Sequence, residues 1–203
     1  MEDLSTAELL RRVRRRDEAA FAILVKRHRA VLLRTARGLL GPAGAYEDVV
    51  QETFWKLCRR PPRLRSEAPE LQDRQLGGWL LQVTRNHCMD HVRQETRRRN
   101  RERLSARAES TAGGLDQVET RDQGQHAEQL MQELPPAQRE VLVLRLCADK
   151  SYREIANLTN RTVGTVGWLI SEGLKELGQR FEASSTRPAD TEAKAASLLR
   201  SRI

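Results

Sequence analysis

The stretch WLLQVTRNHCMDHVRQETRRRNR, residues Trp79–Arg101, ends in the most basic run of the chain. Placed on a helix at about 100° per residue, its side chains separate onto two sides. One side gathers Leu80, Leu81, Thr84, Cys88 and Val92, and the other gathers Gln82, Arg85, Asn86, Arg93 and Arg97. A solvated helix face usually mixes charges, whereas here only Asp90 and Glu95 oppose the arginines. We therefore expect the first side to pack and the second to meet phosphate.

The net charge of +8 is confined to the first half of the 203-residue chain. Residues 1–100 hold 21 Lys and Arg against 13 Asp and Glu, and residues 101–203 hold 15 of each kind. A cationic excess within one module predicts binding to nucleic acid or to an anionic membrane surface. With 38% hydrophobic residues and few aromatic side chains, the composition favours small helical modules over one large core.

Three cysteines, Cys58, Cys88 and Cys147, lie far apart in the sequence. Their odd number favours reduced thiols in a cytosol over a disulfide framework. His87, Cys88 and His91 have the residue types of metal ligands, but no second ligand pair stands at a customary spacing. We therefore expect neither a metal nor a cofactor.

The N-terminus precedes no apolar run, and the longest apolar stretch, Val141–Ala148, is broken by Arg145. These features predict a cytoplasmic protein without a signal peptide or a membrane span. No Ser/His/Asp constellation, phosphate-binding glycine loop or paired carboxylate points to an enzyme.

Cap signals predict the first helices. Ser5 and Glu8 have the spacing of a capping box, and Asp17 is a second N-cap. After Asp17, apolar residues recur at helical spacing until three glycines and a proline within residues 38–44 end the helix. The first module is therefore predicted to be helical.

The next predicted helix, near residues 46–57, carries a second candidate surface. Opposite its apolar stripe lie Asp48, Gln51, Glu52 and Trp55. Acidic residues near a helix N-terminus suit the helix dipole, but the dipole does not explain a large aromatic on the same side. An aromatic with a polar rim is typical of a protein-binding hot spot.

Composition predicts the connections between these elements. Residues 61–78, rich in Pro, Arg and acidic residues, are predicted to form a functional loop. Residues 104–125 read as a flexible linker between domains 1–103 and 126–181, and residues 182–203 as a disordered tail.

The second module contains a helix-turn-helix pattern. Tyr152–Ala156 is predicted to be helical, and Asn160 to take the left-handed turn. The buried stripe of the following helix is predicted to be Val163, Val166, Leu169, Ile170 and Leu174. The residues expected to face DNA are Arg161, Thr162, Gly164, Thr165, Trp168, Ser171, Glu172 and Lys175. A three-helix module without DNA contact is the alternative.

With both modules in view, the chain resembles the sigma factors of bacterial RNA polymerase, specifically the extracytoplasmic-function (ECF) group. The segments that carry the resemblance are Asp17–Phe21, Glu47–Phe54, Trp79–Asp90, Leu134-Pro135 with Arg139, and Glu154–Val166. The resemblance implies an all-α fold with two small helical domains, sigma domain 2 and the helix-turn-helix sigma domain 4, joined by a flexible linker.

The resemblance also implies a role for each surface. The helix containing Trp55 would grip the coiled coil of the largest subunit of core RNA polymerase. The 61–78 loop and the Trp79 helix would open the minus-ten element of promoter DNA and capture an unpaired base. The residues expected at that element are Trp79, Arg85, Asn86, Arg93 and Arg97. The second module would read the minus-thirty-five element, and catalysis would belong to the polymerase.

One departure from the family concerns the recognition helix. Thr165-Val166 is followed by Gly167 and Trp168, where ECF sigma factors usually carry several Lys or Arg. Trp168 could pack on a thymine methyl group and Glu172 could accept from cytosine. The alternative is that the tail or a partner covers Trp168.

Two other functions fit parts of the chain. A stand-alone helix-turn-helix transcriptional regulator would leave the first module unexplained, and a polymerase-binding adaptor would need no contact with bases. The sequence leaves open whether an anti-sigma factor binds this protein.

Overall fold

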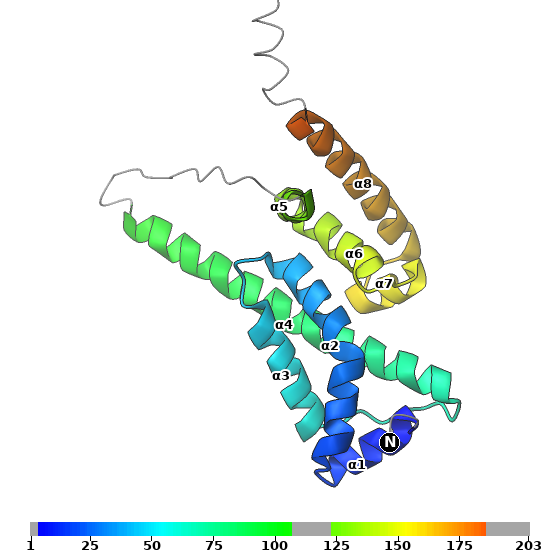
Figure 1. The fold of residues 1–203 in the computed structure, drawn as a ribbon. Coiled ribbons are helices and arrows are strands. Elements are labelled where there is room, and N and C mark those ends of the chain that lie inside the picture. Colours follow the sequence, from blue (N-terminus) through cyan, green and yellow to red (C-terminus); the bar gives the residue numbers. More distant parts are fainter. Residues whose placement is uncertain (1–3, 107–122, 186–203) are drawn as a thin grey trace, which may run out of the picture.

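The computed structural model describes residues 4–106 and 123–185, and these two ranges contain eight α-helices and no β-strand. In chain order the helices are α1 Thr6–Arg14, α2 Glu18–Leu40, α3 Tyr46–Arg59, α4 Pro69–Ala106, α5 Gln123–Glu133, α6 Pro136–Leu146, α7 Tyr152–Thr159 and α8 Val163–Ser185. Figure 1 shows α1 to α4 as one bundle and α5 to α8 as a second. The predicted all-α fold with two helical modules is confirmed.

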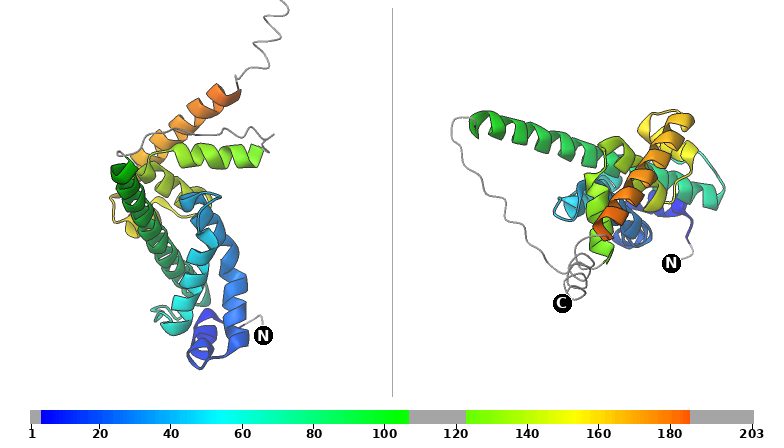
Figure 2. Two further views of the ribbon diagram at one scale, coloured as in Figure 1. Left: turned by 90° about the vertical axis from the view of Figure 1, so that its left-hand side faces the viewer. Right: turned by 90° about the horizontal axis from the view of Figure 1, so that it is seen from above.

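The first module is built on α2, α3 and α4, with α1 across one end of the bundle (Figure 2). The predicted caps are present, because Ser5 Oγ accepts from the Glu8 N–H at 3.3 Å and Asp17 Oδ1 accepts from the Ala20 N–H at 3.0 Å. Apolar side chains of all four helices meet in one core, which includes Leu9, Leu24, Leu32, Val49, Leu57 and Leu80.

A buried pair of hydroxyls connects α3 to α4. Thr53 Oγ1 and Thr84 Oγ1 lie 3.1 Å apart, and Thr53 also donates to the Val49 carbonyl oxygen at 2.9 Å. Both threonines are fully buried, so these hydrogen bonds avoid the cost of unpaired hydroxyls in the core. Thr84 therefore lies on the predicted packed side of α4, and this side faces α3.

The prediction of a loop over residues 61–78 was wrong for its second half, because α4 begins at Pro69. Proline is favourable in the first helical turn. Gln72 and Leu76 are buried, and the Gln72 side chain bonds to the Ser66 and Glu67 carbonyl oxygens at 3.2 and 3.0 Å. Packing and these bonds outweigh the low helix propensity of Gly77 and Gly78.

The second module packs α6, α7 and α8 around buried Leu142, Ile155 and Val166. A capping box starts α7: Ser151 Oγ accepts from the Glu154 N–H, and Glu154 Oε2 accepts from the Ser151 N–H at 2.9 Å. Partial burial alone would raise the pKa of Glu154, but the Ser151 hydrogen bonds and the charge of Lys150 lower it to about 2. Asn160 takes the predicted left-handed turn, with φ 54°.

The buried stripe of α8 differs from the prediction. Val163 and Leu174 are exposed, whereas Val166, Leu169 and Ile170 are buried. The stripe continues through Gly173, where a Cβ atom would lie 2.7 Å from Leu142 Cδ1. Close approach of α6 at this glycine turns Leu174 outward.

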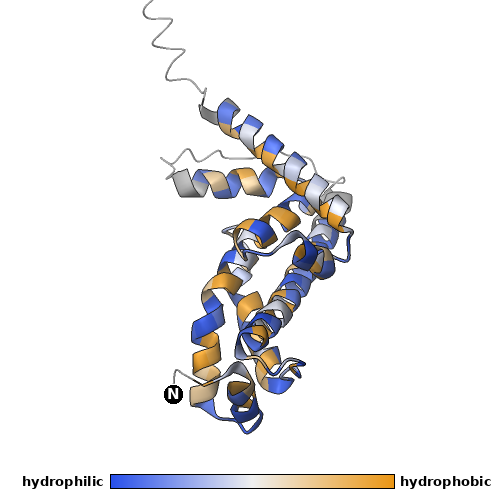
Figure 3. Cartoon of the chain, turned by 90° about the vertical axis from the view of Figure 1, so that its right-hand side faces the viewer, coloured by the Kyte–Doolittle hydropathy of each residue, from blue (hydrophilic) through white to orange (hydrophobic). Residues whose placement is uncertain are grey.

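The two modules pack against each other at the C-terminal end of α2. Val143 and Ala148, from the second module, belong to the core of the first. Gly38 makes room for Val143, since a Cβ atom there would lie 2.9 Å from Val143 Cγ2. Gln132 Nε2 donates to the Gly38 carbonyl oxygen at 2.8 Å. In Figure 3 apolar and polar segments alternate along the helices of both modules.

The predicted linker and tail fall largely outside the described residues. Helix α4 continues to Ala106, α5 begins at Gln123 and α8 continues to Ser185, so helix occupies both ends of the predicted linker and the start of the predicted tail. The domain boundaries themselves stay a prediction. None of the described helices has the length and apolar character required to cross a membrane.

Candidate protein and nucleic-acid interfaces

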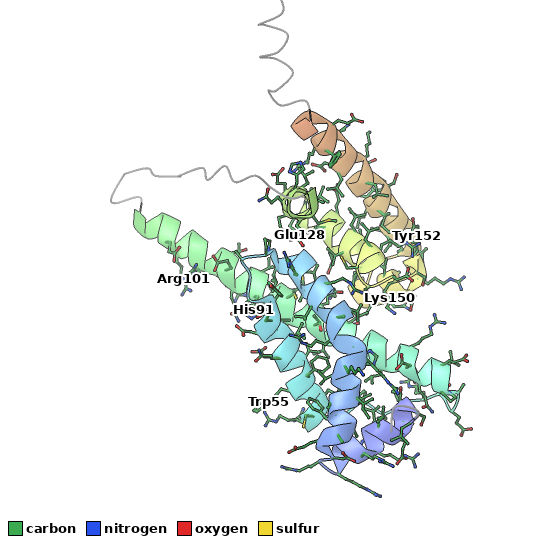
Figure 4. The ribbon with its side chains drawn as sticks, in the orientation of Figure 1. Trp55, His91, Arg101, Glu128, Lys150 and Tyr152 are labelled. Atoms are coloured by element: carbon green, nitrogen blue, oxygen red, sulfur yellow. The ribbon has the colours of Figure 1, made fainter. Side chains whose placement is uncertain are left out.

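The outward side of α3 forms the first candidate surface, and all four predicted residues lie on it exposed: Asp48, Gln51, Glu52 and Trp55. Trp55 is 67% exposed, although a tryptophan usually buries most of its surface. The Arg59 guanidinium lies 5.0 Å from the Trp55 ring centre, which orients the ring without covering it. Figure 4 shows Trp55 on the side of the first module away from the second.

A groove between α2 and α3 extends this surface. Apolar side chains line it beside Trp55, including Phe21, Val25 and Phe54, and Gln51 and Glu47 stand at its polar edge. An exposed aromatic next to an apolar groove with a polar rim has the composition of a protein-binding site.

Glu52 differs from the other three residues of this face because it also has a structural partner. Its Oε2 lies 2.8 Å from Nδ1 of His87 on α4. Glu52 therefore joins α3 to α4, whereas no such contact between helices involves Asp48, Gln51 or Trp55 among the described residues.

The His87, Cys88 and His91 cluster considered as a metal site does not assemble into one. Cys88 is fully buried in the first core, and burial raises the pKa of its thiol to about 12. A thiol with that pKa stays protonated at neutral pH and is a poor ligand. Over residues 4–106 and 123–185, no group of three His, Cys, Asp or Glu side chains is placed to hold a metal ion.

The second module covers one part of the arginine side of α4 and leaves the other part exposed. Arg93 and Arg97 are exposed, Arg93 with an ion pair to Asp90 at 3.1 Å, and Asn86 is exposed as well. Further along, Arg97, Arg98 and Arg101 line an open hollow beside His91. Figure 4 labels His91 and Arg101 along this part of α4. Arg85 is different, since only 18% of its side chain is exposed.

Trp79 also departs from the expected exposure. It is half-buried and packs against the first core. Its ring therefore stabilises the packing of α4 against the first core. A contact between Trp79 and DNA bases stays a prediction.

The helix-turn-helix presents most of the predicted face to solvent. The exposed residues are Thr162, Gly164, Thr165, Trp168, Ser171 and Lys175, and the half-buried ones are Arg161 and Glu172. Trp168 is 61% exposed. Thr162 Oγ1 accepts from the Thr165 N–H at 3.1 Å and so caps α8, a role that the sequence interpretation missed.

One buried carboxylate, also missed from the sequence, pairs with one arginine from each of the two surfaces that are predicted to bind DNA. Glu140 on α6 is 3% exposed. Its Oε1 accepts from Arg85 Nε at 2.7 Å and its Oε2 from Arg161 Nη1 at 2.6 Å. The only signal in the sequence is an acidic residue directly before the apolar run that begins at Val141.

Comparison with protein families assigns both modules. Residues 24–98 match the family model described as sigma-70 region 2, and residues 126–177 match the model described as sigma-70, region 4. The chain belongs to the sigma-70 family.

Its similar relatives within this family are ECF sigma factors. The chain is 31% identical over 169 residues to the probable ECF RNA polymerase sigma factor SigI of Mycobacterium tuberculosis. The aligned region covers 80% of this chain and 56% of SigI. It is 27% identical over 175 residues to the ECF RNA polymerase sigma-E factor of Salmonella typhimurium. That aligned region covers 81% of this chain and 88% of the sigma-E factor. The chain thus spans little more than half the length of SigI.

Two solved structures share the fold of this sigma-70 family member. One is CnrH in complex with the cytosolic domain of CnrY, with a TM-score of 0.60 and 24% identity over 86% of this chain and 96% of that one. The other is the sigma factor RpoE in complex with the anti-sigma factor NepR from Bartonella quintana, with a TM-score of 0.54 and 24% identity over 77% of this chain and 95% of that one.

Proposed function

We propose that this protein is an ECF sigma factor that directs core RNA polymerase to specific promoters and helps to open the DNA. The observation that carries the proposal is the presence of both sigma-70 regions in one chain, each with an exposed face of the required chemistry. The face centred on Trp55 would bind the coiled coil of the largest subunit. Asn86, Arg93 and Arg97 would contact the minus-ten strand, and the α8 face the minus-thirty-five element.

Catalysis would reside in the polymerase, and the protein would act in the cytoplasm, where polymerase and chromosome meet. We also expect an anti-sigma partner, because the sigma factor RpoE, which shares this fold, is in complex with the anti-sigma factor NepR in its solved structure. A stand-alone regulator would have no use for region 2, and an adaptor would have no use for the exposed helix-turn-helix face.

Run-off transcription with purified core polymerase on genomic fragments tests the proposal. We expect transcripts from a small set of promoters only when this protein is added. Operator binding without polymerase would favour the stand-alone regulator, and polymerase binding without transcripts would favour the adaptor.

The arginine side of α4 gives a quantitative test. We expect Arg93→Ala with Arg97→Ala to reduce promoter opening by the holoenzyme and to lower the salt dependence by about two units of slope, since each lost phosphate contact removes about one. Permanganate reactivity of unpaired thymines across a salt series measures both quantities.

The matched control for that variant is Arg11→Ala with Arg34→Ala, which removes two exposed arginines from α1 and α2. The net charge changes equally, so an equal loss of opening would mean that the effect is one of overall charge. Footprints identical to those of the parent in the α4 variant would remove these residues from the interface.

A further inference from the structure

Glu140 stands between the two surfaces that the proposed function assigns to DNA. A carboxylate with only 3% of its residue surface exposed requires cationic partners, because an unpaired buried charge is strongly destabilising. It takes one from each module: Arg85 from α4 in the first and Arg161, two residues before α8 begins, in the second. Each oxygen accepts one short, charge-assisted hydrogen bond.

Other polar contacts surround this pair of bonds on the same side of α4. Gln82 Nε2 donates to the Leu158 carbonyl oxygen at 3.4 Å, and Arg74 lies 3.8 Å from Glu154. At the end of α2, Arg37 pairs with Glu128 at 2.8 Å. The second module therefore covers the Gln82 and Arg85 part of the α4 surface and leaves Arg93 and Arg97 open.

This packing conflicts with simultaneous reading of two promoter elements. Elements centred near minus ten and minus thirty-five are separated by about 25 base pairs, or about 85 Å along B-form DNA. Modules that share a core and an ion pair cannot reach both, so they must separate first. The sixteen residues between α4 and α5 span up to about 55 Å when extended, which permits separation.

We infer that Glu140 is an autoinhibitory latch, which holds the free protein closed by pairing with Arg85 and Arg161, one arginine from each of the two faces that the sequence predicts to meet DNA. The inference rests on the proposed function. Promoter binding competes for both arginines, and opening of the modules exposes the covered part of α4. The apparent affinity for promoter DNA then falls in proportion to the open fraction.

A reversible lock between the modules tests the latch. A Cβ atom at Gly38 would lie 3.6 Å from Val143 Cβ, within the range of disulfides. Gly38→Cys with Val143→Cys, in a chain with Cys58→Ser and Cys147→Ser, should crosslink under mild oxidation. Oxidised holoenzyme should give at least tenfold less run-off transcript than the same preparation after reduction, and the Gly38→Cys single variant should not respond to oxidation.

The release of the latch is measured on the same cysteine pair in the full-length free protein. Glu140→Gln should slow disulfide formation about tenfold, a coupling of ordinary size between sites. Glu133→Gln is the control, because Glu133 pairs with Arg180 within the second module at 2.9 Å and is exposed.

The possible results distinguish a failure of the latch from a failure of the proposed sigma function. Equal transcription by the oxidised and reduced lock, or equal crosslinking rates in Glu140→Gln and Glu133→Gln, would overturn the latch while leaving the sigma function intact. Absence of transcripts from the reduced lock and from the parent alike would instead count against the proposed function. Reduction that restores activity shows that the locked protein was folded.

Discussion

Asp48→Ala together with Gln51→Ala and Trp55→Ala should weaken binding to core polymerase at least about 30-fold, since truncating one interface hot spot costs about 2 kcal/mol or more. These side chains lie opposite the buried stripe of α3, so the fold should survive their loss. Glu52 is left in place because it holds His87 on α4. A titration of labelled protein with core polymerase gives the affinity, and circular dichroism verifies the helix content.

Lys56→Ala is the matched control for that triple variant. Lys56 is exposed on the same helix, about a quarter of a turn from the face. Its loss should change the affinity little. A folded triple variant that binds core polymerase as tightly as the parent would show that the α3 face has another use.

The second large effect concerns the stability of the helix-turn-helix. Gly173→Val should lower the free energy of unfolding by about 1–3 kcal/mol, the usual cost of overpacking a core. The cause is the close approach of α6, which leaves Gln138 Cβ 3.3 Å and Leu142 Cδ1 2.7 Å from an added Cβ atom. Denaturant titration followed by circular dichroism measures the loss.

Gly178→Val provides the comparison, since it adds the same side chain to the same helix where nothing lies within 4 Å of the new Cβ atom. Both variants change helix propensity equally, so the difference between them isolates the contact with α6. If the two unfold at the same denaturant concentration, α8 does not pack on α6 at this glycine.

Local signals in the sequence predicted those parts of the fold that depend on neighbouring residues. Asp17 and Ser5 cap helices, Asn160 makes the left-handed turn, and Thr84 lies on the predicted packed side of α4. In each case the determining residue lies within one or two helical turns of the feature that it sets.

Features set by distant residues were misjudged or missed. The Pro, Arg and acidic residues of 61–78 predicted a loop, but the burial of Gln72 and Leu76 keeps its second half helical. Leu174 seemed a better core residue than Gly173, because no local pattern reveals how closely α6 approaches.

The same reason explains the gap in the predicted site. The arginines of α4 and the helix-turn-helix face were identified from charge and periodicity, but Glu140 was not. Its role depends on the meeting of Arg85 and Arg161, which lie 55 and 21 residues away from it in the chain.

Helix α4 has a mechanical consequence as well. It is 38 residues long, or about 57 Å at 1.5 Å per residue, and its deeply buried positions lie between Gln72 and Cys88. After Cys88 the helix continues for about 27 Å beyond this buried section. A rotation of the buried section within the first module therefore displaces the far end of α4. If α4 tilts by about 10° about Cys88, its far end moves by about 5 Å. Small adjustments of the core beneath α4 are therefore magnified where Arg97 and Arg101 stand.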